Sequence, residues 1–248
     1  MLVAVLPLAI LIGVSLGLFG GGGATLAVPI LTYVADMTPN QAIASSLFVV
    51  AVTSVTGVAA HGRARLVSWR IGLIFGAAGM VGSYAGGRLA AAFSGHALMI
   101  LFGVMMAATA IAMLRGRRFR APRATDELRA AHVLVLGVIV GLVSGLVGAG
   151  GGFLIVPVLV LLGGLAIEAA IATSLVVIAM QSFAGLAGHL GHVDLDWPIT
   201  VAVTVMAVAG SWIGGALAHR IPPARLSRGF GLFIIVMATF VLLRELVP

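Results

Sequence analysis

Long uncharged apolar runs alternate with short polar stretches along the whole chain. Each run is close to the roughly 20 residues that a helix needs to cross about 30 Å of hydrocarbon. The clearest runs are Gln41–Ala60, Ile71–Gly87, Leu98–Leu114, Ala169–Leu190 and Ile199–Ala218. This pattern predicts an all-α polytopic membrane protein that forms a single integral membrane domain.

The chain also repeats itself. When residue 13 is placed on residue 141, the remaining residues align without a gap, and Pro29 falls on Pro157. Further pairs stay in register, among them Ser46 with Ser174, Gly57 with Gly185, His61 with His189 and Trp69 with Trp197. Because apolar composition alone would not align glycine, serine, histidine and tryptophan, the chain is predicted to consist of two tandem copies of one unit.

Each copy is expected to contain a glycine-interrupted first segment followed by three ordinary transmembrane helices. In the first copy, residues 1–115, these are Leu2–Ala35, Gln41–Ala60, Ile71–Leu89 and Leu98–Leu114. In the second copy, residues 132–248, they are Val133–Leu162, Ala169–Leu190, Ile199–Ala218 and Leu226–Leu243. The arginine-rich residues 116–131 are predicted to join the copies as a linker.

The arginines distinguish two topologies. If each first segment crosses the bilayer once, the copies are parallel, and the 14 basic residues divide ten to four between the two faces. If each first segment re-enters and turns back, the copies are inverted, and only Arg88 and Arg244 lie opposite the other twelve. The positive-inside rule favours inverted repeats, with the linker in the cytoplasm and both termini outside.

Charge and cysteine content exclude several functions. Only 8% of the residues are charged, whereas a soluble domain carries about a quarter. The net charge of +7 comes from arginines between the apolar runs, which favours topology control and headgroup contact over nucleic-acid binding. There is no cysteine, and the spacing of Asp194 and Asp196 beside His192 favours a solvated loop over a metal site. No metal, cofactor or nucleic acid is therefore predicted.

Two glycine tracts at equivalent positions form the predicted substrate site. Irregular backbone at membrane depth must be buried in protein or line a watery cavity. The limb after each tract is too short to span the bilayer, so it is interpreted as a half-helix whose N-terminal amides attract a small anion. The alternative is that the glycines only permit tight helix packing. The positions are Gly20, Gly21, Gly22, Gly23, Ala24 and Thr25, and Gly148, Ala149, Gly150, Gly151, Gly152 and Phe153.

The second helix of each copy adds polar side chains to this site. Ser46 and Thr53 lie on one side of the first of these helices, and their equivalents are Ser174 and Gln181. Hydroxyl and amide groups can replace water around an oxyanion without adding a fixed charge. The alternative is that the hydroxyls bond to helix carbonyls or join helices, and for Thr53 alone this alternative is favoured.

These features resemble the TauE/SafE family of membrane transporters, also called sulfite exporters. The glycine-rich turns read Gly20-Gly-Gly-Gly-Ala-Thr and Gly148-Ala-Gly-Gly-Gly-Phe, and the following helices carry Ala44-Ser-Ser and Ala172-Thr-Ser. The resemblance implies a secondary carrier of sulfite, thiosulfate or an organosulfonate such as sulfoacetate in the bacterial cytoplasmic (inner) membrane. It does not single out sulfite. The implied partners are a small anionic substrate and the lipid bilayer, and a homodimer is left open.

Two other functions remain as alternatives. An anion channel would use the same residues without alternating access. An intramembrane serine hydrolase would need Ser174 or Ser182 within hydrogen-bonding reach of His189. Because Ser182 and His189 are seven residues apart on one helix, about 10 Å along its axis, they could pair only through another helix. The chain is predicted not to be an enzyme.

Overall fold

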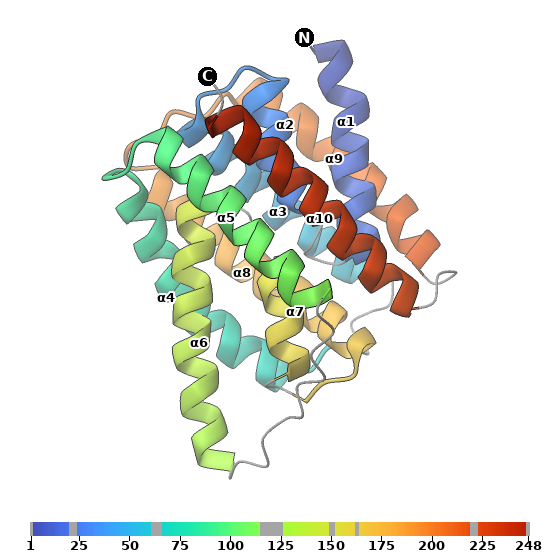
Figure 1. Cartoon of the computed structure of the whole chain (residues 1–248). Coiled ribbons are helices and arrows are strands. Elements are labelled where there is room, and N and C mark those ends of the chain that lie inside the picture. The colour runs from blue at the N-terminus through green and yellow to red at the C-terminus, as the bar shows by residue number, and fades with distance from the viewer. Residues whose placement is uncertain are drawn as a thin grey trace.

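The computed structural model describes residues 2–19, 24–60, 66–114, 126–148, 152–161, 164–218 and 223–246, and every regular element in these ranges is a helix (Figure 1). The first copy contributes α1 (Leu2–Phe19), α2 (Ala27–Tyr33), α3 (Pro39–Ala60), α4 (Trp69–Ala90) and α5 (Gly95–Leu114). The second contributes α6 (Asp126–Val147), α7 (Gly152–Leu161), α8 (Ile167–His189), α9 (Trp197–Ala218) and α10 (Pro223–Leu246). The all-α prediction is confirmed, and both copies place a short helix second.

The described helices suit a lipid environment. By length and composition, three of them could cross a membrane, namely Pro39–Val58, Ala169–His189 and Trp197–Leu217. Four shorter apolar helices accompany them, at Val5–Leu18, Ala24–Tyr33, Gly95–Ile111 and Leu134–Val147. Large apolar side chains also face outward, and Val81, Val205 and Leu232 are each more than 60% exposed. Such a surface is unfavourable in water and favourable in hydrocarbon, so the protein is a multi-pass membrane protein.

The second copy begins earlier than its apolar pattern predicts. Helix α6 starts at Asp126, whereas the sequence places the apolar segment at Val133 and the linker at residues 116–131. Hydropathy marks where a helix meets lipid and does not mark where the helix begins.

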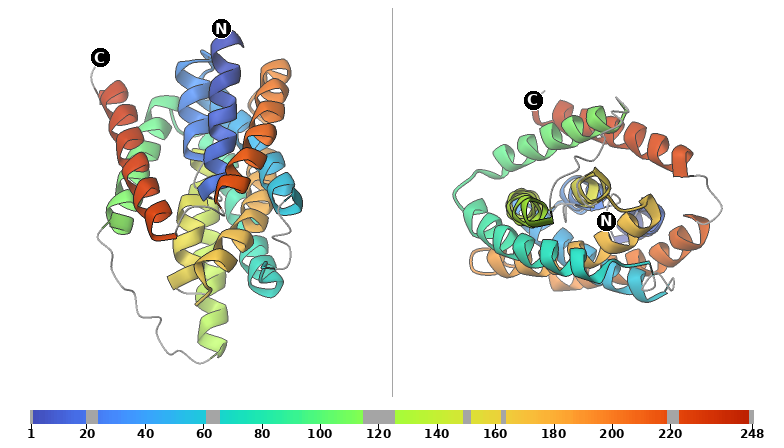
Figure 2. Two further views of the ribbon diagram at one scale, coloured as in Figure 1. Left: turned by 90° about the vertical axis from the view of Figure 1, so that its right-hand side faces the viewer. Right: turned by 90° about the horizontal axis from the view of Figure 1, so that it is seen from below.

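The corresponding first helices start at opposite ends of the molecule. Both chain termini lie at one end, where α1 begins, and α6 begins at the other end (Figures 1 and 2). Figure 2 also shows α5 and α10, which pack together, along one edge. The last helices of the two copies are therefore neighbours.

The two copies are interlocked through glycines. Helix α1 packs against α9 of the other copy, and α6 packs against α4. A Cβ atom added to any of eight glycines would overlap a backbone carbonyl oxygen of the facing helix. Small residues allow this close approach between helices in a membrane. The glycines are Gly13, Gly17, Gly210 and Gly214 at the α1–α9 crossing, and Gly82, Gly86, Gly141 and Gly145 at the α4–α6 crossing.

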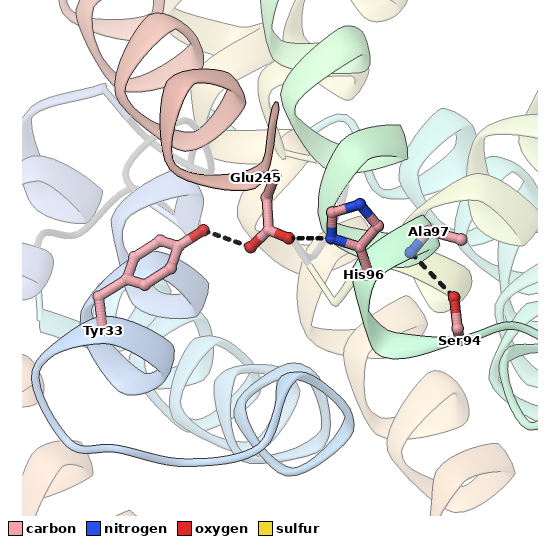
Figure 3. A network of polar contacts seen from close by, with 5 residues as sticks. All are labelled: Tyr33, Ser94, His96, Ala97 and Glu245. Atoms are coloured by element: carbon pink, nitrogen blue, oxygen red, sulfur yellow. Dashed lines mark hydrogen bonds and ion pairs between the residues drawn. The ribbon is translucent and has the colours of Figure 1, made fainter. Parts of the chain in front are cut away.

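A polar network joins three helices at the end that holds the termini (Figure 3). The Tyr33 hydroxyl donates to Glu245 Oε1 at 2.8 Å, and Nδ1 of His96 lies 2.6 Å from Glu245 Oε2. The Arg244 guanidinium lies over the Tyr33 ring, 5.9 Å from its centre. The last residue of the short helix α2 is thus held to α5 and α10.

Candidate functional site

The structure describes part of the predicted substrate site. Seven of the predicted residues, Gly20, Gly21, Gly22, Gly23, Ala149, Gly150 and Gly151, lie outside the described residues. Ala24 and Thr25 form a buried 3-10 turn that leads into α2, while Gly152 and Phe153 open α7. Ser46 and Thr53 lie on α3, and Ser174 and Gln181 lie on α8, with all four side chains at most 1% exposed.

The second glycine tract begins against a helix of the first copy. Gly148 directly follows α6 and has φ +75, a left-handed conformation that glycine adopts without strain. Its carbonyl accepts a hydrogen bond of 2.6 Å from Ser46 Oγ, and its own N–H donates to Ser144 O. A Cβ at Gly148 would lie 2.8 Å from Ile43 Cα. Two predicted site residues from different copies, Ser46 and Gly148, are therefore in direct contact.

Matching backbone turns follow the two short helices. Asp36 and Gly164, which are equivalent in the repeat, have φ values of +53 and +63. The next residue bonds back to the helix in each case, from Met37 N to Leu31 O at 3.1 Å and from Leu165 N to Leu159 O at 3.3 Å. The same local geometry therefore turns the chain back after α2 and after α7.

Three of the predicted hydroxyls are engaged within the protein. Ser46 Oγ lies 2.7 Å from Ile43 O as well as near Gly148 O, Thr53 Oγ1 bonds Val49 O at 2.6 Å, and Ser174 Oγ bonds Ile171 O at 2.8 Å. A serine or threonine hydroxyl carries one proton, so it cannot donate to a ligand while these bonds persist. Their part in substrate binding stays a prediction.

Gln181 differs from these three residues. Its side chain is fully buried, and neither Nε2 nor Oε1 has a hydrogen-bond partner in the described part of the chain. The amide occupies space that a side chain at Gly79 would fill, since a Cβ there would overlap Nε2. Leaving a buried amide unpaired costs about 1–3 kcal/mol, so buried polar groups normally have a partner. Gln181 is therefore a buried amide without a described partner, and its part in substrate binding stays a prediction.

Four further hydroxyls lack a partner within the described residues, those of Thr32, Ser54, Ser144 and Ser182. Two of them, Ser54 and Ser182, occupy equivalent positions of the repeat, and the sequence pattern does not single out Ser54. Ser54 on α3 and Ser182 on α8 are fully buried, and neither hydroxyl is hydrogen-bonded within the described ranges. Ser182 is considered from sequence only as a hydrolase nucleophile. The signal that could have identified the pair is the repeat itself, because serine recurs at the same position of both copies.

The hydrolase alternative is not supported by the geometry. His189 is fully buried, its Nε2 lies 2.9 Å from Gly145 O, and its Nδ1 has no partner among the described residues. Ser174 bonds Ile171 O instead, and Ser182 bonds nothing described. Neither candidate serine is therefore paired with the histidine that would have to activate it.

Apart from histidine, the buried polar side chains in the described part of the chain carry no charge. Buried polar side chains, where the structure describes their exposure, are all Ser, Thr, Gln or His. Within the searched part of the chain, no group of three or more His, Cys, Asp or Glu residues could hold a metal ion. The described buried side chains thus offer a ligand hydroxyl, amide and imidazole groups, to which backbone amides can be added.

The chain is similar to known membrane transporters along most of its length. The family described as "Sulfite exporter TauE/SafE" matches residues 5–241. A protein of Xylella fastidiosa named "Probable membrane transporter protein" is 34% identical over 242 residues, covering 95% of this chain and 92% of that protein. A probable membrane transporter of Methanocaldococcus jannaschii is 31% identical over 260 residues and covers 96% of both chains. The probable transporter YunE of Bacillus subtilis is 28% identical over 88% of both. No solved structure matches the chain.

Proposed function

Because the chain belongs to the TauE/SafE family of membrane transporters, we propose that it is a secondary carrier of a small anion. The substrate class is a sulfur oxyanion or organosulfonate such as sulfite, thiosulfate or sulfoacetate. The observation that carries this proposal is the fully buried Gln181 amide, neither polar atom of which has a partner within the described residues, in an interior whose described polar side chains other than histidine are neutral. Neutral donors can bind an oxyanion and release it again, as a carrier requires.

The glycine tracts supply the attraction for charge in this proposal. Helix α7 begins at Gly152, the last glycine of the second tract, and its first backbone amides carry a partial positive charge. Such a terminus contributes about 0.3–2 kcal/mol to holding an anion, so two of them select for charge without binding tightly. The Ser46 contact to Gly148 O supports the proposal, because it holds the start of this tract inside the protein.

The proposed repeats are inverted and lie in the bacterial cytoplasmic membrane, with the linker on the cytoplasmic side. The opposite starting ends of α1 and α6 support this topology (Figure 1). Arg88 lies in the last turn of α4, shortly before His96, which contacts Glu245 beside Arg244. The two arginines expected outside are therefore at the same end of the molecule as both termini.

Cysteine labelling in intact cells tests this topology. Since the chain contains no cysteine, single substitutions give unambiguous labelling. We expect Arg88→Cys to react with a membrane-impermeant maleimide added outside, while Arg63→Cys and Arg225→Cys react only after the cells are permeabilised. Labelling of Arg63→Cys and Arg225→Cys from outside, with Arg88→Cys protected, would disprove the inverted arrangement.

Uptake by purified protein in liposomes tests the function. We expect saturable uptake of radiolabelled sulfite or thiosulfate and exchange against unlabelled anion inside. Gln181→Ala should raise the half-saturating concentration about 2- to 13-fold, because it removes one hydrogen bond worth about 0.5–1.5 kcal/mol. Gln41→Ala is the matched control, since that amide bonds Asp194 O in an exposed position. Conductance without saturable exchange would indicate a channel, and product formation without flux would indicate a hydrolase.

A further inference from the structure

Ser54 on α3 and Ser182 on α8 differ from most of the other buried hydroxyls. Ser46, Thr53 and Ser174 bond to carbonyls of their own helices, as do Ser15, Thr204 and Ser211. Ser54 and Ser182 are each 0% exposed, and neither makes such a bond or any other within the described residues. Ser144 is also buried without a described partner, but its counterpart in the repeat is Leu16, whereas Ser54 and Ser182 are counterparts of each other. Because buried hydroxyls nearly always have a partner, an equivalent pair without one points to a bound group.

The two serines lie on the faces through which α3 and α8 contact each other. A Cβ at Gly57 would lie 3.7 Å from Leu175 Cδ1, and one at Gly185 would lie 3.3 Å from Leu47 Cδ1. Ser54 is seven residues after Leu47 and three before Gly57, so it shares their side of α3. The repeat places Ser182 in the same relation to Leu175 and Gly185. Both hydroxyls therefore belong to the α3–α8 contact.

The same two contacts define how the helices cross. Gly57, late in α3, faces Leu175, early in α8, and Leu47, early in α3, faces Gly185, late in α8. The helices are therefore antiparallel. They cross midway between these contacts, near Val52 and Met180. Each serine lies two residues beyond that point, in opposite directions. Their positions are therefore about 6 Å apart along the helix axes. This is the offset along the axes alone, and it is compatible with both hydroxyls donating to one small group that lies between the helices, because each O–H···O distance is about 2.7 Å.

The neighbouring Gln181 indicates the chemistry of that group. Its amide has no partner within the described residues and is one residue from Ser182, but it faces Gly79 of α4, so it shows that the protein interior at this level of α8 is neutral and polar. No carboxylate or guanidinium is among the described buried side chains. Neutral donors on two sides suit a small ion with several equivalent oxygens better than they suit a metal cation or an apolar molecule.

On the basis of the proposed carrier function, we propose that Ser54 and Ser182 form a substrate-binding pair that holds a small oxyanion between the two copies. The ion sits at the α3–α8 crossing and accepts one hydrogen bond from each copy. Because the two serines are equivalent in the repeat, each half of the protein contributes the same hydrogen-bond donor to the ion. A site between two equivalent halves can open to either side of the membrane without losing its donors.

The test compares Ser54→Ala, Ser182→Ala and the double variant with wild type, using radiolabelled sulfite and thiosulfate uptake by liposomes. Ser211→Ala is the matched control, because Ser211 is 2% exposed and its hydroxyl bonds Val208 O on its own helix. We expect the double variant to raise the half-saturating concentration about tenfold or more, as the loss of two hydrogen bonds predicts, while Ser211→Ala leaves it unchanged. Thermal unfolding in detergent is measured with and without each anion.

The unfolding data separate binding from a structural role. Without anion, the double variant should melt at or above the wild-type temperature, because alanine removes two unmet polar groups. Sulfite or thiosulfate should then raise the melting temperature of wild type and of Ser211→Ala but not that of the double variant. If wild type takes up the anion and the double variant has the same half-saturating concentration, the serine pair is wrong but the carrier function is supported. A wild type that neither transports nor is stabilised by these anions would overturn both proposals.

Discussion

Gly13→Val and Gly141→Val are expected to destabilise the folded protein more than any other single change considered. These equivalent glycines lie against backbone of the facing helix, Gly13 against Ala207 and Gly141 against Gly79. A valine side chain cannot fit unless α1 moves away from α9, or α6 from α4. Because backbone cannot yield as a side chain can, the cost should be about 3 kcal/mol or more, at the upper end of over-packing effects. This is a large part of the 5–15 kcal/mol by which folded proteins are typically stable.

Thermal unfolding of the purified protein in detergent measures this effect. For a chain of this length, about 3 kcal/mol corresponds to a fall in melting temperature of about 6–12 °C. Gly229→Val on α10 is the matched control, because a Cβ added there meets no described atom within 4 Å apart from its chain neighbours and its own helix backbone. If Gly13→Val and Gly141→Val melt at the same temperature as Gly229→Val, the close α1–α9 and α4–α6 crossings are wrong.

Gly22→Val and Gly151→Val are expected to abolish transport while leaving the protein inserted and folded. Both glycines lie in the tracts proposed to present backbone amides to the anion. Valine would crowd those amides and would disfavour any left-handed conformation that glycine adopts there. With no charged side chain among the described buried residues, nothing described replaces the lost attraction.

Uptake and unfolding are measured on the same preparations of these variants. We expect no uptake of radiolabelled sulfite or thiosulfate, with a melting temperature close to that of wild type. Arg118→Gln in the linker is the control, and it should transport normally. Normal transport by the valine variants, together with loss of flux in Arg118→Gln, would show that the linker arginine and not the backbone amides attracts the anion.

The sequence by itself determined that this is a helical membrane protein, and it predicted two related halves. Hydropathy is a local property, so a run such as Gln41–Ala60 identifies a membrane helix without knowledge of its neighbours. The register of Gly, Ser, His and Trp between the halves is likewise visible in one dimension, and so is the likeness to a transporter family. Helix ends were predicted less well, because α6 begins with polar residues, and a hydropathy pattern counts only the apolar part of a helix.

Only the tertiary structure decided which polar groups are free. Ser46 and Ser54 are both buried serines on α3, yet Ser46 bonds Ile43 O and Gly148 O while Ser54 bonds nothing described. The difference depends on side-chain rotamers and on which helix lies opposite, and neither can be predicted from the spacing of residues in the sequence. The crossing of each first helix with a helix of the other copy is equally non-local, because it joins glycines such as Gly13 and Gly210 that are far apart in the chain. Hydropathy is set residue by residue, whereas hydrogen-bond satisfaction is set by the whole packed arrangement.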